Sequence, residues 1–128
     1  MLIVCSSLMF ACSSADQPQN LLAGGWSAVE LGGDSATVRI LTSESSLRAR
    51  REVEFELGVE GHMDRWPKTL RLRADMTHMS HGPTQTELRL DGQHYRGTIV
   101  FVMGGLWDLE FFEDDVVILR GQILVREN

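Results

Sequence analysis

Residues 52–60 read EVEFELGVE: apolar residues stand at the odd positions, and acidic residues stand at the even positions except Gly58. Successive side chains of a strand point to opposite faces of a sheet, so this alternation predicts a strand with one dry face and one wet face. Residues 69–76, TLRLRADM, repeat the pattern with Arg and Asp on the wet face. If these two strands pair, Arg and Glu side chains meet across them and add about 0.2–1 kcal/mol per pair.

Five more strands are predicted where short apolar or alternating runs stand between Gly and Asp turn signals. These runs cover residues 36–41, 86–90, 95–103, 106–112 and 116–125. No segment shows the apolar stripe of a helix. About seven short strands in a single domain of residues 26–128 predict an all-β fold, an antiparallel immunoglobulin-like β-sandwich that lacks the Cys-Trp-Cys signature of antibody domains.

The N-terminal sequence predicts export to the cell envelope. Residues 1–11 form an apolar run that is too short to span a bilayer and is typical of a signal peptide. Cys12 follows, and then a polar linker, so that residues 12–25 resemble the start of a bacterial lipoprotein with the lipid on Cys12. The alternatives are an ordinary cleaved signal and a buried apolar strand. We therefore expect a lipid-anchored protein on the periplasmic side of a bacterial membrane, with no transmembrane helix in the mature chain.

Charge and cysteine content exclude several classes of function. The formal net charge is -6, and nucleic-acid binding needs a basic stripe that neutralises phosphates, so we expect no nucleic-acid partner. Cysteine occurs only at positions 5 and 12, which leaves the predicted domain without a thiolate for zinc or an iron–sulfur cluster. The sequence contains no nucleophile elbow, phosphate loop or isolated pair of carboxylates. We therefore predict that the protein is not an enzyme.

Residues 76–81, MTHMSH, carry two thioethers and two imidazoles directly before a Gly-Pro pair that breaks the strand. These soft ligands suit Cu(I) and tolerate Cu(II), whereas Mg, Ca and Mn prefer oxygen. On a regular strand the four side chains would point to both faces, so the segment must bend to surround one ion. The alternative is a strand end with an inward-packed methionine and solvated histidines. The sequence thus predicts a copper site, with Cu(I) preferred, whose ligands are Met76, His78, Met79 and His81.

Three further residues are candidates for the same ion or for a weaker second site. His62 and Met63 form a soft pair after a glycine turn, although solvated loop residues are the favoured interpretation. Met103 precedes a Gly-Gly turn and could join the site from another strand. Its parity with Ile99 and Phe101 favours a core position instead.

Three stretches of the chain resemble one family of exported domains. They are the Met-His turn in residues 74–83, a strand with a Gly-x-Tyr-like element in residues 88–98, and a Met-Gly-Gly-x-Trp-x-Leu hairpin in residues 101–109. Together they resemble the core of the YtkA-like and FixH-like domains. The resemblance implies a β-sandwich and a role in copper handling or respiratory-oxidase assembly. The chain departs from the commonest Met-Pro-Met version through the hydroxyl residues between its ligands, and it shows no counterpart of the FixH-like membrane helix.

Two functions follow from these observations. The preferred one is a membrane-tethered periplasmic copper-binding protein involved in copper carriage or respiratory-oxidase assembly, whose partner is a copper-accepting protein or a respiratory complex. The alternative is a metal-free interaction module of an envelope or respiratory complex. Such a module would dock through an exposed strand edge or an apolar patch, and its Met-His turn would be incidental.

Overall fold

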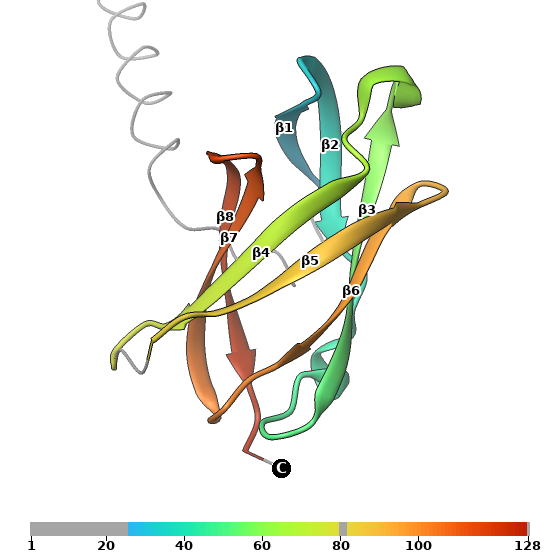
Figure 1. Cartoon of the computed structure of the whole chain (residues 1–128). Helices are drawn as coiled ribbons and strands as arrows, with labels where there is room; N and C mark the ends of the chain where they lie inside the picture. The colour runs from blue at the N-terminus through green and yellow to red at the C-terminus, as the bar shows by residue number, and fades with distance from the viewer. Residues whose placement is uncertain (1–25, 80–81, 128) are drawn as a thin grey trace, which may run out of the picture.

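The structure is a computed structural model that describes residues 26–79 and 82–127 (Figure 1). In this part of the chain, no helix is long and apolar enough to cross a membrane. The predicted signal peptide, Cys12 and the linker lie outside the described residues. The strands are β1 Ser27–Leu31, β2 Asp34–Ile40, β3 Glu52–Gly61, β4 Thr69–Met76, β5 Thr84–Asp91, β6 His94–Val100, β7 Gly105–Glu113 and β8 Val116–Val125, and two short 3-10 helices are η2 Glu44–Ser46 and η3 Met63–Arg65.

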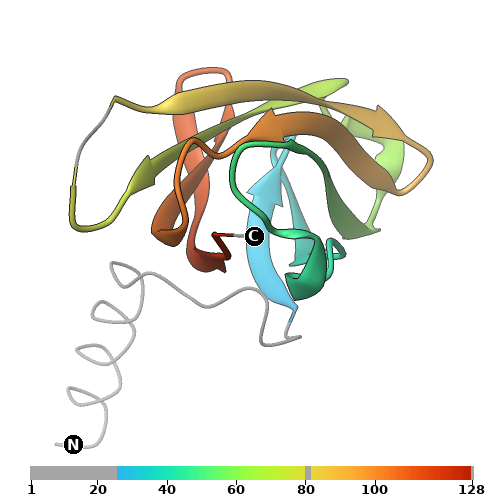
Figure 2. The same cartoon turned by 90° about the horizontal axis from the view of Figure 1, so that it is seen from below.

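All eight strands belong to one antiparallel sheet with the order β1-β2-β3-β6-β5-β4-β7-β8. The sheet curls round until its two edge strands, β1 and β8, lie near each other (Figure 2). Immunoglobulin-like domains place strands A, B, E and D in one sheet and strands C, F and G in the other. Here β2, β3, β6 and β5 form the first set, β4, β7 and β8 form the second, and the β4–β5 ladder joins them. The predicted all-β, antiparallel, sandwich-like fold is confirmed.

The strand predictions fail in three places. The sequence pattern misses β1, a short strand in which only Val29 and Leu31 are buried. The strand predicted at residues 95–103 ends at Val100, because the chain then turns into β7. β3 and β4 are not neighbours, so the Arg–Glu pairs expected between them do not form. Arg73 of β4 instead pairs with Glu110 of β7, with 3.1 Å between Nη1 and Oε1.

The dry faces of the strands enclose one core. Phe55 of β3 and Phe111 of β7 meet across it with their ring centroids 5.9 Å apart, which packs the two sets of strands together. Burial of an aromatic side chain of this kind stabilises the fold by about 1.5–3 kcal/mol. The hydroxyl of buried Tyr95 donates to the carbonyl oxygen of Pro67 at 2.6 Å. Burial, reinforced by the carboxylate of Glu113, raises the pKa of this tyrosine.

The turns gather at two opposite ends of the strands. One end carries the turn that follows β4, the turn that follows β6 and the C-terminal end of β8. We call it the methionine end, because Met76, Met79 and Met103 lie there. The opposite end carries the β1–β2 turn, the link from β3 to β4 and the β7–β8 turn. The candidate metal ligands therefore lie at two separate ends of the sheet.

Candidate functional site

Met76 is the last residue of β4 and the first of the predicted copper ligands. Its side chain is half-buried and packs against the core. Across the ladder it faces Trp107 of β7. Its Cε lies 3.2 Å from the point that a Cβ on Gly105 would occupy. The glycine thus leaves room for the Met76 thioether beside the turn that leads into β7.

The chain bends directly after Met76, and β7 holds the bend. The backbone N–H of Thr77 donates to the carbonyl oxygen of Leu106 at 3.0 Å. The hydroxyl of Thr77 donates to the carboxylate of Asp108 at 2.9 Å, and the amide of Gln122 donates to the same oxygen at 3.0 Å. These contacts fix the first residue of the turn on the surface of the sheet.

The turn after β4 presents the next two predicted ligands to solvent. His78 and Met79 are both exposed, and 49% of the surface of Met79 is accessible. A thioether this exposed contributes little to packing, so it is available to another partner. His81, the fourth predicted ligand, lies outside the described residues.

Met103 belongs to the turn between β6 and β7 and is 36% exposed. The core position that its parity favoured is wrong, because β6 ends at Val100 and the alternation ends with it. The indole Nε1–H of Trp107 donates to the carbonyl oxygen of Met103 at 3.0 Å. The same indole packs edge-on against Phe101, with 5.2 Å between the ring centroids. Buried aromatic residues therefore support the backbone that presents the Met103 side chain.

Arg50 and Glu127 fasten the same turn from the outside. The backbone N–H of Arg50 donates to the carbonyl oxygen of Phe101 at 2.7 Å, and the N–H of Gly104 donates to the Glu127 carboxylate at 2.7 Å. The guanidinium of Arg50 pairs with that carboxylate. These hydrogen bonds, first from Arg50 and then from Gly104, lower the pKa of Glu127. The turn is thus tied to an ionised side chain just beyond β8.

The structure separates the candidate ligands into two groups. Residues 76–79 and Met103 lie at the methionine end. His62 and Met63 precede β4 at the opposite end, where both are exposed. The 8 residues of β4 separate the groups by about 24 Å, at roughly 3.4 Å per residue. One ion therefore cannot use both groups.

No family model, curated protein or solved structure matches the chain. The resemblance to the YtkA-like and FixH-like domains thus stays a prediction. What the site can do chemically has to follow from its donor atoms.

The candidate metal ligands of the methionine end are soft donors. Across residues 26–79 and 82–127, no group of three or more His, Cys, Asp or Glu side chains could hold a metal ion. A metal site here would depend on thioether sulfur together with imidazole nitrogen. This combination suits Cu(I) and disfavours cations that prefer oxygen ligands. The residues present therefore fit copper better than zinc, calcium or magnesium.

The residues that support these turns were not recognised in the sequence. Arg50 and Glu127 are 77 positions apart, so no local pattern links them. Arg50 also has a φ of 61°, a conformation that its residue type does not indicate. Only Asp108 carries a local signal, because it interrupts an apolar run between Trp107 and Leu109 and so belongs on the wet face.

Proposed function

We propose that this protein binds and carries Cu(I) in the cell envelope. The observation that supports the proposal best is the gathering of sulfur donors at one end of the sheet. Met76 lies against the turn that bears Met103, and Met79 is exposed in the adjoining turn. His78 and His81 would add imidazole nitrogen to the same set. Thioether and imidazole ligands suit Cu(I), so the donor atoms of this cluster favour that ion.

The donor set also fits carriage better than permanent storage. None of its members is a thiolate, so all of the protein ligands are uncharged and the ion can pass to a partner by stepwise ligand exchange. The hydrogen-bonded Met103 turn would hold its donor in place before the ion arrives, which lowers the entropic cost of binding. A lipid on Cys12 would keep the protein at the periplasmic face of a membrane, close to a copper-accepting respiratory complex.

The ligand assignment predicts a complete loss of copper binding in one variant. Replacing Met76, His78, Met79 and His81 together by Ala should abolish the binding of about one Cu(I) per chain and leave the circular dichroism spectrum unchanged. Affinity is measured under reducing conditions by competition with a chelator of known affinity. The matched control replaces His62 and Met63 by Ala, which removes a soft pair at the opposite end and should leave affinity unchanged. Unaltered Cu(I) retention in the quadruple variant would contradict the site assignment, whereas the absence of Cu(I) binding by the unaltered protein would favour the metal-free interaction module.

Acidification should lower the affinity for Cu(II) more than the affinity for Cu(I). An imidazole must be neutral to bind metal and ordinarily titrates near pH 6.5, whereas a thioether has no proton to lose. Between about pH 7.5 and about pH 5.5 we therefore expect a much larger loss of affinity for Cu(II) than for Cu(I), because only Cu(I) is held well by the methionines. Competition titrations with both ions measure the two losses. Equal losses would mean that the methionines are not ligands.

A further inference from the structure

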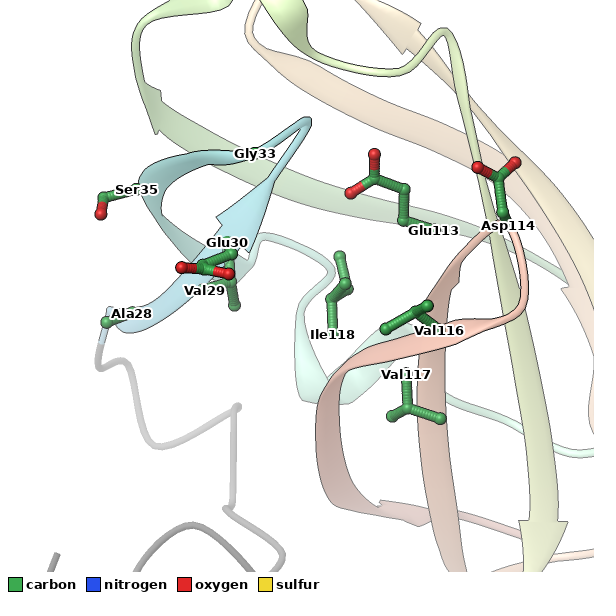
Figure 3. A pocket seen from close by; sticks show the side chains of 10 residues that line it. All are labelled: Ala28, Val29, Glu30, Gly33, Ser35, Glu113, Asp114, Val116, Val117 and Ile118. Carbon is green, nitrogen blue, oxygen red and sulfur yellow. The ribbon is translucent and has the colours of Figure 1, made fainter.

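The edge strands β1 and β8 border an open groove, which we call the seam. All ladders of the sheet are antiparallel, so β1 and β8, at positions one and eight, run in opposite directions. Along the described chain, no strand pairs with the outer edge of either one. The seam has a volume of about 650 Å³ (Figure 3). The residues that line it include Glu30, Glu113, Asp114, Val116, Val117 and Ile118.

The chain itself already adds a backbone segment next to the far end of β8. Arg126, directly after β8, forms a parallel bridge with Arg48. The N–H of Ala49 donates to the carbonyl oxygen of Arg126 at 2.8 Å, and the N–H of Arg126 donates to that of Leu47 at 2.9 Å. Leu47 and Ala49 are buried there. The backbone that continues β8 thus accepts an extended partner at the methionine end, and the seam is the part next to β1 that lacks one.

The chemistry of the seam is acidic and apolar. Among the described residues that line it, Glu30, Glu113 and Asp114 are acidic and none is basic. Val116 is 64% exposed, and Val117 and Ile118 are partly exposed beside it. Native proteins usually protect open strand edges with lysine or proline, and the first half of β8 contains neither. The β7–β8 ladder does carry a register shift between Phe111 and Phe112. An edge without lysine or proline and with exposed aliphatic side chains is typical of a surface that receives another strand.

We propose that the seam binds an extended segment of a partner protein that pairs with the edge of β8 and carries alternating apolar and basic side chains. Its backbone would complete the hydrogen bonds of the edge, its apolar side chains would cover Val116 and Ile118, and its basic side chains would face the carboxylates. A second copy of this chain is a poor occupant, because it would bring the same three acids and a net charge of -6 to an acidic groove. The seam and the copper site are independent, so either proposal stands if the other fails.

The test uses the full chain and three capped heptapeptides. The first alternates Lys and Val, the second alternates Glu and Val, and the third repeats the Lys-Val sequence with alternate backbone nitrogens methylated, so that it cannot complete a ladder. We expect only the first peptide to bind saturably, with a Kd of up to about 1 mM. Amide exchange at residues 116–118, followed by NMR, should slow in that complex and stay unchanged with the other two peptides.

Two paired variants test the role of the carboxylates. Glu30→Gln with Asp114→Asn should weaken binding of the Lys-Val peptide about three- to tenfold, since each exposed ion pair contributes modestly. Asn tolerates the left-handed backbone at position 114, where φ is 54°, so the turn is kept. The control, Glu44→Gln with Glu60→Gln, removes the same charge elsewhere and should leave binding unchanged.

Four results with the peptides would overturn the proposal. They are no binding of the Lys-Val peptide, equal binding of the methylated peptide, equal binding of the Glu-Val peptide, and an unchanged affinity in the Glu30 and Asp114 variant. A dimer in sedimentation that Val116→Lys dissociates would assign the seam to a second copy and would also overturn it.

Discussion

The methionine end and the seam are two differently built parts of the same curled sheet. At the methionine end, side chains far away in the sequence bind the turns, as Asp108 does at the Thr77 hydroxyl and Glu127 does at the Gly104 N–H. At the seam, two strand edges stand side by side without a ladder among the described residues, and the Glu113 carboxylate ties only the β1–β2 turn through the Gly32 N–H. Tied turns can hold small donors in fixed positions for an ion, whereas an open edge can accept a whole backbone. The two regions thus differ in which parts of the sheet are joined by hydrogen bonds, and substitutions in each region can test this difference.

The largest loss of stability is expected in the β1–β2 turn, which lies beside the seam in close contact with the backbone of Arg65. A Cβ on Gly32 would lie 1.8 Å from the carbonyl oxygen of Arg65, and φ at Gly32 is 61°. Gly32→Ala must therefore displace the β1–β2 turn and should lower the free energy of unfolding by about 3 kcal/mol or more. Gly33 also has a positive φ, but no atom lies within 4 Å of its Cβ position. Gly33→Ala should cost only about 1 kcal/mol.

Urea unfolding of both glycine variants measures these costs. The N–H of Gly32 also donates to Glu113 at 3.0 Å, so displacement of the turn should widen the seam. Of the two variants, only Gly32→Ala should therefore bind the Lys-Val peptide more weakly. Similar losses of stability in the two variants would show that close contact with Arg65 does not hold this end.

An intermediate effect is expected from one chemical change made at both ends. Trp107→Phe removes the hydrogen bond to the Met103 carbonyl and some volume, so it should cost about 2 kcal/mol and lower Cu(I) affinity about three- to tenfold as the turn loosens. Trp66 is also buried, but its Nε1 has no hydrogen-bond partner in the described part of the chain. Trp66→Phe should therefore cost less and leave Cu(I) affinity unchanged. Equal changes in Cu(I) affinity in the two variants would show that the hydrogen-bonded Met103 turn does not contribute to the copper site.

The smallest effect is expected in the stability of the protein at acid pH, where Glu127 of the methionine end becomes protonated. Arg50 and Gly104 lower the pKa of Glu127, so the contribution of this carboxylate to stability is complete above its ordinary pKa of 4.5 and fades as the pH falls through the lowered value. Glu127→Gln should abolish that part of the pH dependence while the amide oxygen still accepts from Gly104. Unfolding midpoints compared between about pH 3 and about pH 7 measure the change. The same acid dependence in both proteins would exclude Glu127 as its source.

The sequence predicts most of the sheet, because burial of one face imposes a period of two on each strand. This pattern locates β2 to β8, and the inward position of Met76 follows from the parity of Leu72 and Ala74. β1 is missed since a strand of 5 residues with two buried positions offers too short a pattern. The pattern also cannot show where a strand stops, which is why Met103 was expected in the core.

The remaining features depend on contacts between distant residues. The sequence contains no sign that Arg50 and Glu127 meet, or that Gln122 reaches the carboxylate of Asp108. The seam is likewise a property of topology: it exists because the first and last strands of the order approach each other without pairing. Both features need the curl of the whole sheet, which residue periodicity does not encode.

The ladder between β4 and β5 has a consequence for the internal motions of the domain. Among the described residues it is the ladder that joins the two sets of strands, since the seam on the other side carries none, although the backbone bonds of Arg126 with Leu47 and Ala49 also link the sets beyond β8. A transient opening of the domain would thus break this hairpin and would be visible in the hydrogen exchange of its amides. Met76 at the end of β4, and His78 and Met79 in the turn that follows it, are the described predicted copper ligands of the same hairpin. An ion bound there would slow the opening, so that metal loading could be read from backbone amides along β4 and β5, away from the ion itself.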